Sequence, residues 1–229
     1  MAVQVWYAEA SAESPGPLEA DCRKALCAEE TERATLFRKP TSANQFVVGR
    51  GMARRLLGAK LNCAPESIPF RFSPHGKPLL DSPQQLGFNV AHTTGMVLCA
   101  IGEYQQVGVD VESTGRKVDI RLAERYFAKS EVEWVFARPP AEQTSAFLKI
   151  WTLKESFIKA IGTGLTMPLD EFAFHDLESS QPTVRIDSDQ HGKDTDWHAF
   201  VFQPVPGYVA ALSVHDPRRP SFTTHPFES

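Results

Sequence analysis

Residues 88–102 read FNVAHTTGMVLCAIG. Two apolar runs, rich in residues that favour strands, lie on either side of Thr93, Thr94 and Gly95. Runs of this kind around a short turn that contains glycine predict a β-hairpin. We therefore expect two paired antiparallel strands here, and the rest of the chain is interpreted outward from them.

Helical and strand-like segments flank this hairpin on both sides. A helical pattern within residues 33–60 precedes it, and the segments that follow are a strand at 107–112, helical segments at 121–127 and 130–136, a stronger helix at 144–161, and strands at 197–202 and 208–214. A helix followed by a hairpin thus occurs twice, which indicates an internal duplication. We expect an α+β fold of two similar halves, residues 1–105 and 106–215, followed by an irregular tail at 216–229.

The composition is that of an ordinary soluble globular protein. The chain has 229 residues, 42% of them hydrophobic, and a net charge of −4. Its four cysteines are scattered without a C-x-x-C pair, so neither a disulfide framework nor a structural zinc site is expected. No signal-peptide pattern and no apolar run long enough for a membrane span occurs. The expected location is the cytoplasm, without a membrane partner.

The net charge conceals a basic segment. Residues 33–60 carry seven Lys and Arg and no Asp or Glu, which leaves −11 on the remainder. Most charge runs are solvated helix faces. Arg50 and Arg54, however, lie one helical turn apart beside an apolar stripe, and such an arginine pair suits a phosphate group. The charge pattern alone favours the solvated face.

Residues 108–112 read Gly-Val-Asp-Val-Glu. The period of two in a strand puts Asp110 and Glu112 on one face and both valines on the other. Taken alone, such a pair is more often an exposed strand face than a metal site. Its context in the chain decides between the two interpretations.

That context is the helix at 144–161. Trp151, Glu155 and Lys159 share one of its faces at i, i+4 and i+8, apart from the apolar stripe. A Glu–Lys helix pair by itself is common. Together with the two strand acids, however, Glu155 offers a third carboxylate for Mg²⁺, and Lys159 offers an ammonium for a phosphate oxygen.

Two turns carry further candidate residues. Residues 74–78 form a tight Pro-His-Gly-Lys-Pro turn around Lys77, and residues 88–93 end a strand in His92 and Thr93. Each is more often structural than functional when it occurs alone. The chain contains neither a P-loop nor a G-x-G-x-x-G run, so those nucleotide-binding folds are not supported.

Taken in order, these motifs resemble those of a known family. His75-Gly76-Lys77-Pro78, Phe88 to His92, Gly108 to Glu112 and Trp151-x-x-Lys154-Glu155-Ser156-Phe157-x-Lys159 are similar to the 4′-phosphopantetheinyl transferases of the Sfp type. The resemblance implies two α+β halves in a pseudo-twofold arrangement, with coenzyme A bound between them. It also implies Mg²⁺-dependent transfer of the phosphopantetheine arm to a serine of an acyl or peptidyl carrier protein, with release of 3′,5′-ADP.

The resemblance also implies roles for individual residues. The metal ligands would be Asp110, Glu112 and Glu155; the 3′-phosphate and adenosine contacts would come from Lys77, His92, Arg50 and Arg33, and the diphosphate contacts from Lys154 and Lys159. Ala91 stands where the family often has a serine before the histidine, so Thr93 or a backbone amide would replace that hydroxyl. Trp151 would serve for packing.

For catalysis, Lys159 and Mg²⁺ would stabilise charge on the phosphorus oxygens. Glu155 is the first candidate for deprotonating the carrier serine, directly or through a metal-bound water, and Glu131 is the second. Neither the pathway nor the natural carrier follows from the sequence.

Two alternatives stay open. A Mg²⁺-dependent nuclease would also use D-x-E and E-x-x-x-K, although the net charge of −4 gives little support for nucleic-acid binding. A non-catalytic coenzyme A or carrier-protein binding module would not need intact acids. Fused halves favour a monomer, because they already form the cleft.

Overall fold

The computed structural model describes residues 2–104, 106–186 and 191–228, so the expected boundary at residue 105 lies outside the described residues. The first half contains β1 (Ala2–Ala8), α1 (Pro17–Arg23), α2 (Ala28–Thr35), α3 (Pro40–Leu61), β2 (Phe70–Phe72), β3 (Pro78–Leu80), β4 (Gly87–Thr93) and β5 (Met96–Gly102). The second contains β6 (Val107–Ser113), α4 (Leu122–Tyr126), α5 (Lys129–Phe136), α6 (Pro140–Ile161), β7 (Phe172–His175), β8 (Thr183–Ile186), β9 (Trp197–Phe202) and β10 (Tyr208–His215). A last strand, β11 (Ser221–Pro226), ends the chain.

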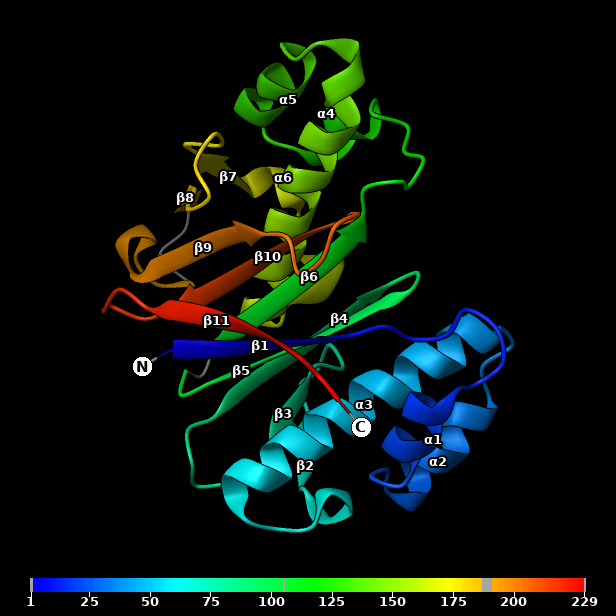
Figure 1. Ribbon diagram of the computed structural model, residues 1–229. Helices are drawn as coiled ribbons and strands as arrows, with labels where there is room; N and C mark the ends of the chain where they lie inside the picture. Colours follow the sequence, from blue (N-terminus) through cyan, green and yellow to red (C-terminus); the bar gives the residue numbers. More distant parts are fainter. Residues whose placement is uncertain (1, 105, 187–190, 229) are drawn as a thin grey trace.

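The expected hairpin is present as β4 and β5, which pair antiparallel. They belong to a four-stranded sheet of order β11-β1-β5-β4 (Figure 1). The irregular tail expected at 216–229 is wrong for its second part. Ser221–Pro226 pairs parallel with β1, from Ala2 beside Ser221 to Tyr7 beside Pro226. This strand returns the end of the chain to the sheet of the first half, a long-range pairing that no local pattern encodes.

The helix α3 covers one face of this sheet. Its buried side chains include Val47, Val48, Met52 and Leu57, which pack in one cluster with residues of β4 and β5. The helix approaches the sheet closely at Gly49, where an added Cβ would lie 2.7 Å from Cγ1 of Val90.

The second half repeats the arrangement of one long helix on one small sheet. Its three strands have the order β6-β10-β9, and α6 lies against them (Figure 1). The predicted apolar stripe of α6 is buried, with Ile150 and Leu153 fully enclosed and Phe157 packed against Phe172 and Trp197. The helix begins at Pro140, four residues before the expected start, since proline is well tolerated in the first turn.

The two sheets meet face to face along β4, β5 and β6. Val3, Met96, Leu98, Val107 and Val109 belong to one buried cluster that both halves share. Polar contacts cross the same junction; for example, the backbone N–H of Val109 donates to Oδ1 of Asn89 at 2.9 Å. Across the residues described, no helix combines the length and apolar character that crossing a membrane requires.

Candidate active site

The two acidic residues of β6 face α6. Asp110 and Glu112 alternate with Val109 and Val111, whose side chains enter the apolar cluster between the sheets. The period of two in a strand places both carboxyl groups on the other face. Asp110 is 5% exposed and Glu112 is 8% exposed. Because such groups are rarely buried without partners, their contacts decide what the site can do.

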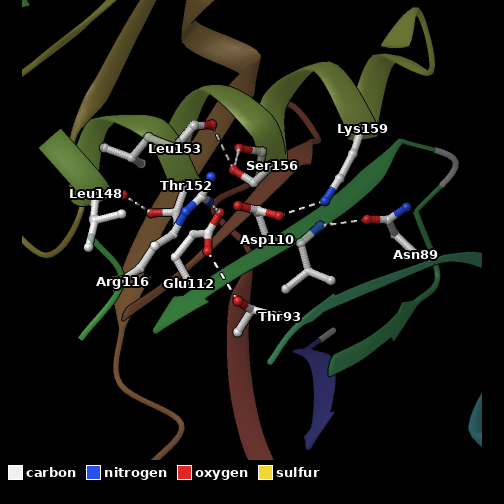
Figure 2. Close-up of polar contacts among 12 residues, drawn as sticks. Asn89, Thr93, Asp110, Glu112, Arg116, Leu148, Thr152, Leu153, Ser156 and Lys159 are labelled. Atoms are coloured by element: carbon white, nitrogen blue, oxygen red, sulfur yellow. Dashed lines mark hydrogen bonds and ion pairs between the residues drawn. The ribbon is translucent and has the colours of Figure 1, made fainter. Parts of the chain in front are cut away.

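Helix α6 supplies a cation and a third carboxyl group. Nζ of Lys159 lies 2.6 Å from Oδ1 of Asp110 (Figure 2). The hydroxyl groups of Thr152 and Ser156 instead donate back to carbonyl groups of their own helix. Glu155 lies one turn before Lys159 on the same helix face. The predicted face of Glu155 and Lys159 therefore lies over the strand acids.

The electrostatics of this cluster are strongly coupled. Burial raises the pKa of Asp110, Glu112 and Glu155 above their ordinary values. Asp110 and Glu112 raise the pKa of Glu155 further, against the opposing effect of Lys159. Burial alone would lower the pKa of Lys159, but Asp110, Glu155 and Glu112 together raise it. The three carboxyl groups thus share an environment that attracts positive charge.

Glu112 has two partners outside α6. The hydroxyl group of Thr93, at the end of β4, donates to Oε2 at 3.1 Å. Oε1 forms an ion pair with the guanidinium of Arg116, in the turn after β6 (Figure 2). Residues from both halves therefore meet at this carboxylate.

The residues present fit a hard divalent cation. Over the described ranges, no group of three or more His, Cys, Asp or Glu side chains is arranged to hold a metal ion as it stands. Nevertheless, Oδ2 of Asp110 is buried and, among the described residues, lacks a hydrogen-bond partner. Asp110 lies close enough to Glu112 and Glu155 that its charge raises the pKa of both. An unsatisfied carboxylate oxygen beside two more carboxyl groups is the donor chemistry that Mg²⁺ prefers.

A cavity of about 730 Å³ opens beside Glu112. Its wall combines Glu112, His92, Thr93 and Arg116 with the beginning of α3, which contributes Lys39, Thr41, Ser42 and Gln45. Gln45 joins the two sides, because its Nε2 donates to the backbone oxygen of Thr93 at 2.7 Å. The charges of Lys39 and Arg116, the hydroxyl groups of Thr41 and Ser42, and the positive end of the dipole of a 22-residue helix make this wall suitable for anions.

His92 contributes a neutral ring to the same wall. The surrounding protein displaces part of its hydration and lowers its pKa, and the nearby ammonium of Lys159 lowers that pKa further. A neutral imidazole can accept or donate one hydrogen bond to a ligand in the cavity.

The expected diphosphate contact of Lys154 is wrong. This side chain is fully buried, and its Nζ lies 2.8 Å from Oε2 of Glu131 and donates to the carbonyl oxygens of Leu169 and Phe172 at 2.7 Å each. Glu131 is equally buried and also accepts from the backbone N–H groups of Ala128 and Phe174. It is therefore a structural group and no longer a candidate general base.

The expected phosphate contact of Lys77 is not supported either. Its Nζ donates to the backbone oxygens of Val107 at 3.2 Å and Ala160 at 3.0 Å. Val107 begins β6, and Glu112 lies five residues further along this strand, roughly 16 Å away at the usual rise per residue. Lys77 thus links the first half to the second, remote from Thr93.

Arg33 and Arg50 line a second cavity, of about 440 Å³. Arg50 pairs with Glu30 at 3.2 Å and stacks over Phe46 and Phe70, and Arg33 also stacks over Phe46. Arg54 is excluded as a phosphate ligand because Glu30, at 2.5 Å, and three carbonyl oxygens take up its buried guanidinium. The acids of α1 and α2 therefore neutralise much of the basic segment.

The site includes residues that the motifs did not single out. Arg116, Lys39, Thr41, Ser42 and Gln45 line the first cavity. The sequence signal for the α3 residues is the proline at its first position, Pro40, which marks the start of the helix. For Arg116 the signal is its place four residues after Glu112, in the turn that follows a strand. As expected, Trp151 packs, here against Tyr126 and Phe147.

The sequence of this chain is similar to those of known proteins. The family model of the 4′-phosphopantetheinyl transferase superfamily matches residues 106–213. A 4′-phosphopantetheinyl transferase of Bacillus subtilis is 30% identical over 167 residues, covering 73% of this chain and 69% of that protein. The chain belongs to the 4′-phosphopantetheinyl transferase superfamily.

Further phosphopantetheinyl transferases match as well. The enzyme Sfp of Bacillus subtilis strain 168 is 29% identical, over 86% of this chain and 85% of that protein. The enzyme gsp of Aneurinibacillus migulanus is 37% identical, over 57% of this chain and 53% of that protein. The matched family region holds both β6 and α6, so the carboxylate cluster lies within it. As a phosphopantetheinyl transferase, the protein is an enzyme, which excludes the non-catalytic alternative.

Proposed function

We propose that this enzyme transfers the 4′-phosphopantetheine arm of coenzyme A to a serine hydroxyl of an acyl or peptidyl carrier protein, with Mg²⁺, and releases 3′,5′-ADP. One observation carries the proposal: Glu112 lines a cavity whose other wall is the cationic start of α3, and Asp110, Glu155 and Lys159 are clustered with Glu112. The cluster suits a metal-bound diphosphate, and the opposite wall suits further phosphate groups.

Asp110, Glu112 and Glu155 would hold the metal. When bound, Mg²⁺ supplies positive charge that stabilises the phosphorus oxygens during transfer. Lys159 adds an ammonium at the same oxygens, since it already lies beside Asp110. His92, Thr93 and the start of α3 would bind the remaining phosphate and the adenosine end, in place of Lys77.

Within the reaction, the serine oxygen forms a bond to the phosphorus that carries pantetheine, and the bond from that phosphorus to the 3′,5′-ADP oxygen breaks. The serine proton passes to a base. Glu155 is the proposed base, because its carboxyl group lies in the same cluster as Asp110, Glu112 and Lys159.

An intact-mass assay tests the function. Purified enzyme, Mg²⁺, coenzyme A and an apo carrier protein are expected to give a carrier heavier by one phosphopantetheine group. Asp110→Asn is expected to lower kcat/KM on the order of 100-fold or more, because it weakens both the metal site and the Lys159 contact. The matched control is Asp119→Asn, since Asp119 is exposed and pairs only with Arg121 among the described residues. Carriers of several types that all stay unmodified would overturn the proposal.

The proposal includes the oligomeric state, the location and the partners of the enzyme. A monomer follows from the two halves meeting at one site, and light scattering of the purified protein measures it. We also propose the cytoplasm as the location, to be checked by cell fractionation, and no nucleic-acid or membrane partner.

A further inference from the structure

The carboxylate cluster already holds two internal cations. Lys159 contacts Oδ1 of Asp110, and Arg116 contacts Oε1 of Glu112, whose Oε2 accepts from Thr93. Among the described residues only Oδ2 of Asp110 is a buried cluster oxygen without a partner. A divalent cation that uses Glu112 as a ligand must therefore compete with Arg116.

The two internal cations differ in how firmly they are held. Lys159 projects from the last turn of α6, which packs on β6, and its side chain is 29% exposed. The Arg116 side chain is 48% exposed and projects from the turn after β6. That turn is anchored at its backbone, because the N–H of Thr114 donates to the oxygen of Gly207 at 2.9 Å and the N–H of Arg116 to that of Ser113 at 3.1 Å. The backbone of Arg116 is therefore held in place, while its guanidinium can be displaced.

The same guanidinium has a second binding option. Arg116 lines the cavity together with Lys39, Thr93 and the start of α3, so a phosphate there lies within the reach of its side chain. A guanidinium binds phosphate oxygens through two parallel N–H groups, a geometry that carboxylates and phosphates share. Moving from Glu112 to a phosphate would keep its charge paired.

We propose that Arg116 is a displaceable counter-ion that occupies Glu112 until a divalent cation binds there and then pairs with a phosphate of coenzyme A. The inference rests on the proposed function. Arg116 would thereby couple the two ligands, since the metal releases the guanidinium that the substrate uses. It acts as a specificity and coupling residue and takes no part in proton transfer.

This role predicts that loss of the Arg116 guanidinium strengthens the binding of a divalent cation and weakens the binding of coenzyme A. Arg116→Gln removes the competitor, so Mn²⁺, used as a probe for Mg²⁺, is expected to bind the coenzyme-free protein about two- to five-fold more tightly in electron paramagnetic resonance titrations. The same variant is expected to raise KM for coenzyme A more than it lowers kcat, and to reduce the gain in Mn²⁺ affinity that coenzyme A produces. Arg116→Lys should recover part of the KM effect, because it restores the charge without the two-pronged geometry.

The matched control is Arg121→Gln. Arg121 follows in the same loop but pairs with exposed Asp119 and does not line the cavity. The Arg121→Gln variant should keep the wild-type Mn²⁺ affinity and KM for coenzyme A. Melting temperatures verify that all variants fold.

The outcomes separate the inference from the function. If Arg116 merely orients Glu112, the Arg116→Gln variant will bind Mn²⁺ more weakly than the wild type or equally well, and the inference is overturned while transfer by the wild type stands. If the wild type transfers nothing to any carrier, the proposed function fails. Tighter Mn²⁺ binding by the variant would even then support Arg116 as the competing cation. A wild type that binds no Mn²⁺ overturns the inference.

Discussion

Three lysines of this chain have different roles because their side chains lie beside different groups. Lys154 and Lys159 are five residues apart on α6, about 140° around the helix, whereas Glu155 and Lys159 are only about 40° apart. Lys159 therefore joins Glu155 at the carboxylate cluster, and Lys154 points to the buried Glu131. Lys77 bonds to two backbone carbonyl groups instead of a ligand.

The buried pair of Lys154 and Glu131 predicts a stability effect. Lys154→Met leaves the Glu131 carboxylate buried without its cation, which should lower the free energy of unfolding by about 3 kcal/mol. The folded fraction should keep its KM for coenzyme A, and urea unfolding with steady-state kinetics measures both quantities.

A second substitution identifies the cause. Lys154→Met combined with Glu131→Gln should recover part of the lost stability, because it removes the unpaired charge. Lys129→Met, on the exposed side of α5, is the control and should unfold like the wild type. A raised KM at unchanged stability would instead return Lys154 to the diphosphate site.

At the scale of elements, the site depends on how closely α6 approaches β6. An added Cβ at Gly108 would lie 2.0 Å from the backbone oxygen of Ser156 and 2.3 Å from the backbone nitrogen of Ala160. Only glycine allows this approach, which brings Lys159 within 2.6 Å of Asp110. The glycine before the two acids is thus part of what assembles the cluster.

Gly108→Ala is therefore expected to separate the helix from the strand. The free energy of unfolding should fall by about 2–3 kcal/mol, and Mn²⁺ affinity should fall with it. Gly115→Ala is the stability control, since its added Cβ would meet nothing closer than Oγ of Ser113 at 3.8 Å. Equal stability of the two variants would contradict this prediction, because it would show that α6 can move away from β6 without lowering the free energy of unfolding.

At the scale of the whole molecule, several contacts among the described residues hold the halves together. The first sheet receives β11 from the end of the chain, and Phe222 of this strand packs against Phe200 and Phe202 of β9. Asn89 of β4 accepts from the backbone of Val109 in β6. Lys77 forms a further connection, at the end of α6. The site at Glu112 therefore depends on how both halves dock.

The Lys77 connection predicts a dependence of stability on pH. Burial lowers the pKa of Lys77 to about 8. Between about pH 8 and the ordinary lysine pKa of 10.5, the unfolded chain holds a proton that the folded protein has released, so rising pH favours folding through this group. The stability of the wild type minus that of Lys77→Met should therefore be constant below pH 8 and increase between pH 8 and 10.5.

Urea unfolding across this pH range provides the measurement. Lys60→Met, at an exposed position near the end of α3, is the control for the loss of a lysine that is not buried. A difference for Lys77→Met that shrinks as pH rises would contradict the lowered pKa of Lys77 and show that its carbonyl contacts outweigh the effect of burial.

Local patterns in the sequence determined the hairpin at 88–102, the strand of Asp110 and Glu112, and the helix face of Glu155 and Lys159, because period and turn chemistry act between near neighbours. Only the tertiary structure decided the rest. The partners of Lys154 and Lys77, the neutralisation of Arg54 by Glu30, the pairing of β11 and the meeting of Arg116 with Glu112 depend on which elements pack together. A charged side chain shows its type in the sequence, but its role follows from the oppositely charged or carbonyl groups that folding brings within reach.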